Sequence, residues 1–284
     1  HWGLVSYEMG NLPGAAEKFQ SAIERAPRNP HPWHNLALVA LKQGAVEQSI
    51  AMLRKAIELK PDHGLAYSNL ALALRRADRL EEALEAAELG VRHKPGNARV
   101  WVVLSDMQLN QGDFARSGES LAQAHQIDPR HVGLHVARGK LEMAKGRVEE
   151  ARLAFEAALA LDSTSPDARG GLGELKLLLG EWAAGWDLYE ARRDVEASPV
   201  RRYPQSLWEG EDLMGRTLLV HAEQGMGDII LFASCLPELV QAGANCVLEV
   251  RPRMQSLFAR SFPSMRVVGR AANAELSDWP ADLP

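Results

Sequence analysis

Residues 30–63 read PHPWHNLALVALKQGAVEQSIAMLRKAIELKPDH, and the residues that follow them, 64–97, repeat the same pattern. Prolines recur every 34 residues, at Pro27, Pro61, Pro95 and Pro129. A second series with this period runs through Gly10, Gly44, Asp78, Gly112, Gly146 and Gly180. A fixed period of this length is typical of a repeat array.

Each unit reads as two amphipathic helices. The first helix opens with a large residue, followed by a leucine and a small residue, as in Trp33, Leu36 and Ala37. The second helix carries small residues that let the two helices approach closely, and it ends just before the proline because that residue lacks an N–H. We therefore expect a chain of helical hairpins.

This pattern resembles the tetratricopeptide repeat. We expect about six units, at residues 1–29, 30–63, 64–97, 98–131, 132–165 and, more weakly, 166–197. The first unit lacks the start of its first helix, which predicts further residues upstream. Such units stack into an α-α superhelix, a solenoid whose first helices line an extended concave surface. The resemblance thus predicts a repeat domain over residues 1–197 that binds a protein or peptide.

Polar residues at the inward positions of the first helices form a candidate peptide-binding groove. Asn35 and Asn69 occupy equivalent positions, and their amides offer the donor and acceptor that an extended peptide backbone needs. This spacing resembles the asparagine ladder of protein O-linked N-acetylglucosamine transferases. The expected groove residues are His34, Asn35, Lys42, Ser68, Asn69, Arg75, Arg76, Arg99 and Asp106. Two alternatives stay open: the asparagines only bond neighbouring helices, or the cations are only solvated surface.

Composition excludes several other classes of protein. The net charge of -5 is spread along the chain, so neither a nucleic-acid tract nor a polybasic membrane patch is indicated, and no apolar run reaches the length of a membrane span. The two cysteines, Cys235 and Cys246, favour a reducing, cytoplasmic setting. His31 and His34 have no carboxylate or thiol at ligand spacing, so we expect no metal site.

A different domain follows the repeats. Residues 198–215 read as a connector anchored by Trp208, and residues 216–284 as part of an α/β domain. Three apolar runs, 217–220, 246–250 and 265–268, alternate with helical stretches, which predicts a parallel, Rossmann-like sheet. The expected fold class is therefore a solenoid followed by a partial α/β domain.

The turn after the first of these strands is the candidate ligand site, because ligands of such sheets sit beyond the carboxyl ends of the strands. Gly225 and Gly227 let the backbone approach an anion at the next helix. Asp228 reads as the cap of a helix beginning at Ile229. Glycines of a loop without an anion, and a dinucleotide site in which Glu249 meets the ribose, are the alternatives.

The segment AEQGMGD at residues 222–228, placed after the repeats and after WDLYE at residues 186–190, resembles repeat-fused glycosyltransferases related to the lipopolysaccharide heptosyltransferases. Those enzymes have two Rossmann-like halves, the GT-B arrangement. The resemblance implies an inverting transfer with Asp228 as base, since such a reaction needs a carboxylate to accept the acceptor's proton. It also implies an acceptor or phosphate loop of Glu223, Gln224, Gly225 and Gly227.

Only part of the amino-terminal, acceptor-binding half is present. The resemblance implies a nucleotide-sugar donor for a complete enzyme, but its binding half is absent here, so we expect no cofactor in this chain and no sugar transfer by it alone. Our leading hypothesis is a truncated, bacterial glycosyltransferase-like protein whose repeats recruit a polypeptide acceptor or partner. The alternative is a non-enzymatic scaffold with a degenerate α/β cap.

Overall fold

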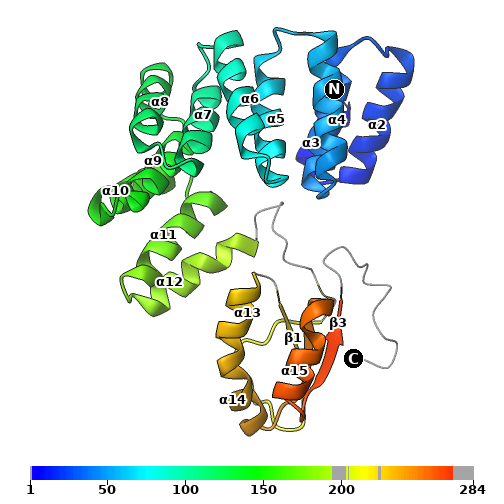
Figure 1. The fold of residues 1–284 in the computed structure, drawn as a ribbon, viewed down its shortest axis with the longest axis vertical. Helices are drawn as coiled ribbons and strands as arrows, with labels where there is room; N and C mark the ends of the chain where they lie inside the picture. The colour runs from blue at the N-terminus through cyan, green and yellow to red at the C-terminus, as the bar shows by residue number, and fades with distance from the viewer. Residues whose placement is uncertain (1, 194–202, 204, 223–224, 271–284) are drawn as a thin grey trace. The chain divides into compact units, whose positions relative to one another are not determined.

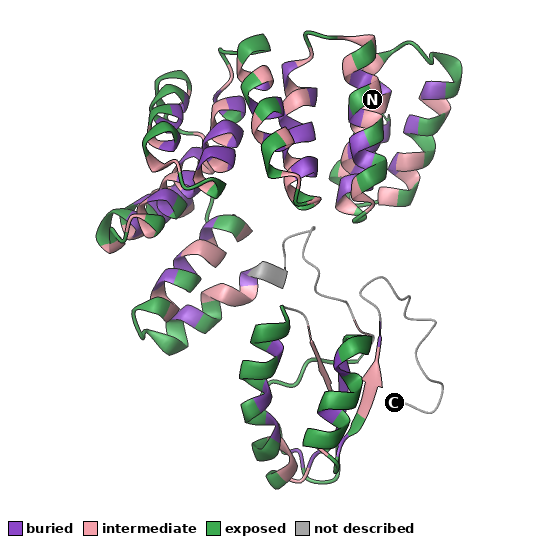
Figure 2. Cartoon of the chain, viewed as in Figure 1, coloured by how far each residue is buried: buried purple, intermediate pink, exposed green. Residues whose placement is uncertain are grey.

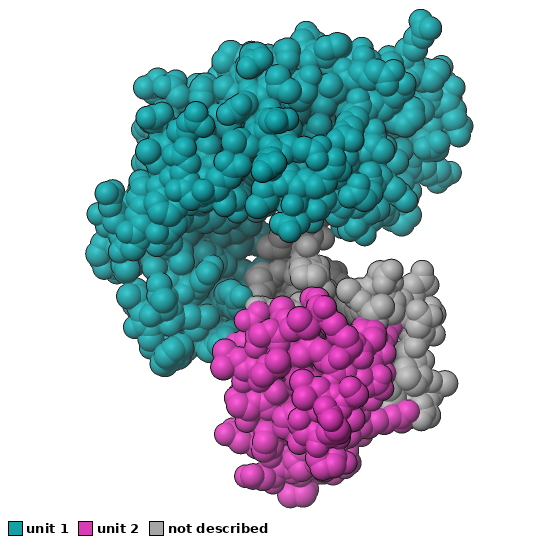
Figure 3. Space-filling view, in the orientation of Figure 1, with its two compact units in different colours: residues 1–198 teal, residues 199–284 magenta. Residues whose placement is uncertain are grey.

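The computed structural model describes residues 2–193, 203, 205–222 and 225–270. Two compact units, residues 1–198 and 199–284, are coloured separately in Figure 3. The described part of the first unit is helical, whereas the second is built around a parallel sheet.

The helices of the first unit come in pairs (Figure 1). The pairs are α1 (Trp2–Glu8) with α2 (Leu12–Arg25), α3 (Pro30–Lys42) with α4 (Val46–Leu59), α5 (Gly64–Arg76) with α6 (Leu80–His93), α7 (Ala98–Asn110) with α8 (Phe114–Ile127), α9 (Val132–Ala144) with α10 (Val148–Leu161), and α11 (Pro166–Leu178) with α12 (Trp182–Tyr189). A 3-10 turn, η1 (Glu190–Arg193), follows the last pair. From α3 onward, both first and second helices start at intervals of 34 residues, which confirms the predicted repeats.

The residue in the turn between the two helices of each pair adopts the left-handed backbone conformation. Gly44 and Gly112 have φ of 79° and 76°, and Asp78 has φ of 59° at the equivalent position. Glycine suits this conformation because it has no Cβ, and aspartate tolerates it better than most other residues. The glycine series therefore recurs because each turn needs a residue that adopts a positive φ.

The large residue that opens a first helix also fastens that helix to the preceding unit. In three units a ring N–H donates to the carbonyl of the proline that ends the previous repeat. The pairs are Trp33 to Pro27 at 3.1 Å, Trp101 to Pro95 at 2.8 Å and His135 to Pro129 at 2.9 Å. Proline thus ends one helix and anchors the next.

Small side chains let the two helices of a pair pack closely. Ala37 is fully buried, and its carbonyl accepts a 2.8 Å hydrogen bond from the Ser49 hydroxyl on the facing helix. The hydroxyls of Ser105 and Ser117 lie 2.7 Å apart two units later. Figure 2 shows buried residues running along the helices where they face one another. A larger side chain at these positions would push the helices apart.

First helices of successive units from α3 to α11 contact one another directly, in addition to their own partners. In the described residues, successive second helices contact one another less than successive first helices do. Because the first helices are the closer-packed row, they lie on the inner side of the superhelix. We call the exposed surface of α3, α5, α7 and α9 the first-helix face. None of the helices in the described ranges is long and apolar enough to span a bilayer.

The second unit contains a sheet of three parallel strands in the order β1 (Thr217–His221), β2 (Asn245–Val250) and β3 (Arg266–Gly269). Thr217 pairs with Asn245, and Val247 pairs with Arg266. Cys246, Leu248 and Val250 alternate along β2 and share a core with α13 (Met226–Phe232), α14 (Leu236–Gln241) and α15 (Gln255–Ser261). These helices therefore cover one face of the sheet.

Two details of this unit differ from the sequence prediction. The expected single helix after β1 is divided by a 3-10 turn, Ala233–Cys235, because Pro237 at the start of α14 removes an N–H and clashes with an unbroken helix. Trp208 does not anchor the connector: its side chain is 47% exposed and donates only to the nearby Glu211 carbonyl, whereas Leu213 is buried in the core.

Candidate functional site

A chain of hydrogen bonds crosses three first helices on the first-helix face. Arg99 of α7 donates through Nη2 to Oδ1 of Asn69 on α5 at 3.0 Å. Nδ2 of the same amide lies 2.6 Å from Nε2 of His34 on α3. Asn69 is buried, whereas Arg99 is exposed to solvent. The polar chain thus begins at the surface and ends at a partly buried histidine.

The hydrogen bonds of Arg99 and Asn69 determine which nitrogen of neutral His34 carries the proton. A guanidinium has no acceptor, so Arg99 holds the amide oxygen of Asn69 and turns the amide NH₂ toward the imidazole. Nε2 of His34 must then accept, which places the proton of the neutral ring on Nδ1. Burial, reinforced by the nearby His63, lowers the pKa of His34 to about 4. His34 is therefore uncharged at neutral pH.

Two more imidazoles lie against His34. The His63 ring centroid is 4.9 Å from that of His34 and 5.4 Å from that of His31. Burial, followed by the charge of His31, also lowers the pKa of His63. Within the ranges that the structure covers, no group of three or more His, Cys, Asp or Glu side chains is arranged to hold a metal ion.

The other predicted cations also join neighbouring helices. Arg76 donates through Nη1 to the carbonyl of Leu41 on α3 at 2.9 Å. Nε of Arg75 lies 3.5 Å from Oδ2 of Asp106 on α7. The ammonium of Lys42 sits 4.0 Å from the centre of the Tyr7 ring. These contacts hold the cations in place on the first-helix face.

The asparagine and serine positions divide into surface and interior. Asn35 is half-buried and hydrogen-bonds the adjacent His34 side chain. Ser68 is 1% exposed and donates to the carbonyl of Gly64, and a Cβ on Gly90 would lie only 2.8 Å from its oxygen. Contrary to the prediction, Ser68 belongs to a close contact between helices, not to the groove surface. Both polar groups of Asn69 are likewise engaged by neighbouring helices, as the packing alternative describes.

The glycine turn of the second unit lies at the carboxyl end of β1. Helix α13 starts at Met226, with Gly225 at the N-cap, so the expectation that Asp228 caps a helix beginning at Ile229 is wrong. Asp228 is an exposed residue of the first turn of α13, where a carboxylate is favoured by the helix dipole. Gly227 is exposed beside it. Glu223 and Gln224 lie outside the described residues.

A polar cluster missed by the sequence analysis lies at the same edge of the sheet. Glu249 is 4% exposed; its Oε2 accepts a 2.6 Å hydrogen bond from the Tyr203 hydroxyl and lies 3.5 Å from Nη1 of the buried Arg270. The Tyr203 and His221 rings are 4.8 Å apart. Because these contacts engage the carboxylate, they argue against its role as a ribose ligand. A glutamate within the apolar run 246–250 was the available signal for buried partners.

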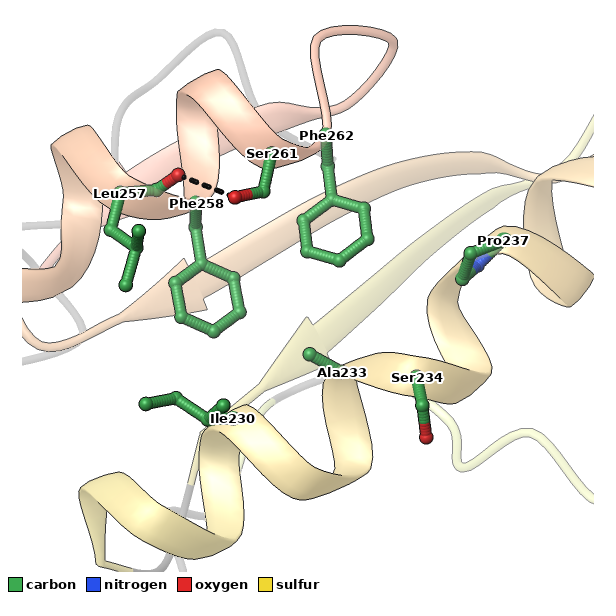
Figure 4. Close-up of a pocket in the computed structure, with 8 residues that line it drawn as sticks. All are labelled: Ile230, Ala233, Ser234, Pro237, Leu257, Phe258, Ser261 and Phe262. Carbon is green, nitrogen blue, oxygen red and sulfur yellow. Dashed lines mark hydrogen bonds between the residues drawn. The ribbon is translucent and has the colours of Figure 1, made fainter.

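An apolar groove of about 330 Å³ lies between α13–α14 and α15 (Figure 4). Ile230 and Pro237 line one wall, and Leu257, Phe258 and Phe262 line the other. Its two hydroxyls are those of Ser234, which donates to the carbonyl of Leu231 in α13, and of Ser261, which donates to the carbonyl of Leu257 in α15. The groove therefore offers shape and apolar surface but little hydrogen-bonding chemistry.

Known protein families match the repeats of this chain. Two family models, both described as tetratricopeptide repeat, match the chain: one at residues 40–106 and the other at residues 2–63 and 136–198. Protein FlbA of Caulobacter vibrioides is 30% identical over 181 residues, which is 61% of this chain and 30% of that protein. The chain therefore spans about 30% of the length of this curated relative.

Solved structures resemble the helical part. TTC0263, a thermophilic TPR protein of Thermus thermophilus, matches with a TM-score of 0.56 and 22% identity, over 62% of this chain and 95% of that one. A chain of the APC/C hetero-tetramer Cut9–Hcn1 matches with a TM-score of 0.56 and 16% identity, over 63% of this chain and 38% of that one. At these identities the similarity establishes the fold alone.

Proposed function

We propose that this chain, a tetratricopeptide-repeat protein, is a scaffold that holds a polypeptide on its first-helix face. The observation that carries the proposal is the row of first helices, packed against one another and linked by His34, Asn69 and Arg99. A surface that is already ordered loses little entropy when a flexible segment binds it. A polypeptide segment bound along the row of first helices also contacts several repeats at once, which gives it more contacts than a single helix offers.

The test is a selection of binding peptides from a displayed random library on the intact chain, followed by affinity measurements on two matched variants. Leu38→Trp replaces an isobutyl side chain by a larger indole at the position equivalent to Asp106 on the first-helix face. Leu153→Trp makes the same change on the exposed side of α10. We expect Leu38→Trp to weaken binding of selected peptides at least tenfold, or about 1.4 kcal/mol. Loss of binding only in Leu153→Trp would reject the proposal.

A second function, for the complete protein, is suggested by the other unit. We infer that the α/β unit belongs to the acceptor side of a bacterial GT-B glycosyltransferase, with Asp228 as base and a nucleotide-sugar as donor. Support comes from the parallel strand order and from Asp228, which is exposed beside the glycine turn at the carboxyl end of β1. Ligands of parallel sheets gather at that edge. The polypeptide held by the repeats would supply the acceptor hydroxyl.

Asp228→Asn in the complete gene product tests this role, because the amide keeps the size of the side chain but does not accept the proton. Glu238→Gln is the matched control, since Glu238 is an exposed carboxylate in the first turn of the neighbouring α14. Sugar transfer to protein is read by intact mass with a panel of nucleotide-sugars. Undiminished transfer by Asp228→Asn rejects the catalytic role, and no transfer by the unmodified protein favours the scaffold with a non-enzymatic α/β cap.

We also propose that the protein resides in the cytoplasm. This proposal is supported by Cys235 and Cys246, which are both free thiols. Fractionation of cells that carry the complete gene product tests it, and recovery outside the cytoplasm would contradict it.

A further inference from the structure

The two rows of helices in the four central repeats carry opposite charge. The first helices α3, α5, α7 and α9 contain six Lys or Arg and two Asp or Glu. Their second helices α4, α6, α8 and α10 contain five basic and ten acidic residues. The first-helix face is therefore basic in a chain whose net charge is -5. A surface opposite in sign to the rest of the molecule favours a ligand of complementary charge.

Most cations of the second helices are paired with a carboxylate of a second helix or of its N-cap. Four of the five lie within an ion pair. These pairs are Arg54 with Glu82 at 2.9 Å, Lys55 with Glu58 at 2.9 Å, Arg116 with Asp113 at 3.7 Å, and Arg152 with Glu149. An acidic ligand would have to compete with these carboxylates for the four cations.

Arg76 and Arg99 on the first-helix face are held differently. Arg76 is bound to the carbonyl of Leu41, and Arg99 to the amide oxygen of Asn69, so both partners are neutral. Neither guanidinium has a carboxylate within 4.0 Å in the part of the chain that the structure describes. Each is thus oriented by one hydrogen bond while its positive charge stays uncompensated.

We infer from this arrangement that the first-helix face takes an acidic segment of a polypeptide, whose Asp or Glu side chains pair with Arg76 and Arg99. This inference rests on the proposed function and adds the chemical class of the ligand. A guanidinium presents a planar set of donors that matches a carboxylate, and one already oriented loses less side-chain entropy on binding. Arg76 ends α5 and Arg99 lies at the start of α7, so a segment that meets both must cross the face.

Neutral His34 completes the arrangement. A positively charged ring in its place would repel Arg99 and remove the acceptor to which Asn69 donates. Since it is neutral, Asn69 stays turned so that its oxygen faces Arg99, and the guanidinium stays in position. The contacts among His34, Asn69 and Arg99 therefore support the exposed cation.

The experiment measures fluorescence anisotropy of two labelled peptides of about twelve residues, one alternating Glu with Gly and the other alternating Gln with Gly. We expect the Glu peptide to bind at least tenfold more tightly, and its affinity to fall as salt rises from about 50 mM to about 500 mM. Arg76→Gln and Arg99→Gln should each weaken it about threefold to tenfold. Arg99→Lys should retain more affinity than Arg99→Gln because the charge remains.

Arg54→Gln and Arg116→Gln are the matched controls, since they remove the same kind of charge from second helices. Thermal unfolding of every variant checks that the fold persists. Equal affinity for the two peptides, or equal losses in controls and test variants, overturns the inference. Tighter binding of a uridine oligonucleotide of the same charge also overturns it, because the ligand would then be nucleic acid.

The two proposals fail in distinguishable ways. If library peptides bind the first-helix face but the Glu peptide does not bind better than the Gln peptide, the acidic ligand is wrong and the scaffold stands. If peptides bind only at the second helices, both are wrong.

Discussion

Acidification from pH 7 to pH 5 is expected to destabilise the repeat unit through His34. Burial and the neighbouring His63 lower the pKa of His34 to about 4 in the folded chain, from an ordinary value of 6.5. Between these values the unfolded chain binds a proton that the folded chain does not. The contribution of neutral His34 to the free energy of unfolding is therefore complete above pH 6.5 and decreases as the pH falls from 6.5 to about 4. The loss at pH 5 is about 2 kcal/mol for this one residue.

The contacts of His34 explain this loss of stability, and two matched variants test the explanation. Protonation of Nε2 removes the acceptor for Asn69 and places a positive charge near His63 and Arg99. His34→Gln keeps an acceptor that does not titrate, whereas His125→Gln removes an exposed histidine of α8.

Urea unfolding at both pH values, followed by circular dichroism at 222 nm, measures the difference. We expect His34→Gln to abolish about 2 kcal/mol of the pH dependence and His125→Gln to leave it unchanged. The lowered pKa of His63 and that of His131 act in the same direction, so some dependence remains in His34→Gln. An identical pH dependence in His34→Gln and the unmodified chain would refute the reasoning.

Other substitutions test the packing. Asn69→Ala removes two hydrogen bonds and leaves Nε2 of His34 without its donor, so we expect urea unfolding to show a loss of about 2 kcal/mol; an unchanged midpoint would contradict a stabilising role for this chain of hydrogen bonds. Gly112→Ala, at φ 76°, should cost about 1 kcal/mol in thermal unfolding, while Asp78→Gly, at φ 59°, should be neutral or stabilising; the reverse order would show that φ is not the cause. Tyr203→Phe removes the 2.6 Å bond to Glu249 and should speed hydrogen exchange of β2, corresponding to about 1 kcal/mol, and unaltered exchange would deny this bond a stabilising role.

The repeats were predictable because local requirements recur along the chain. Proline ends each second helix it follows, and the turn residue between the helices needs a left-handed backbone, so the period fixes where the helices begin. The strands of the second unit were predictable for a similar reason, since short apolar runs alternate with helical stretches. The break at Pro237 was readable from the residue itself.

The partners of the polar side chains were not predictable from the period. The contact of His34 with Asn69 spans 35 residues and that of Asn69 with Arg99 spans 30, so neither joins equivalent positions. Such contacts depend on the stagger of neighbouring helices and on the reach of each side chain. The bond from Tyr203 to Glu249 spans 46 residues and depends on the path of the connector. Sequence reasoning therefore placed the polar residues on the first helices but did not show which of them are buried.

The most direct test of the scaffold proposal is hydrogen–deuterium exchange of the intact chain with and without a peptide selected from the library. We predict slower exchange in α3, α5 and α7 when the peptide is bound, because it lies on the first-helix face and stabilises those helices. Slower exchange confined to α4, α6 and α8, or to the α/β unit, would contradict the proposal that the inner row of helices holds the polypeptide.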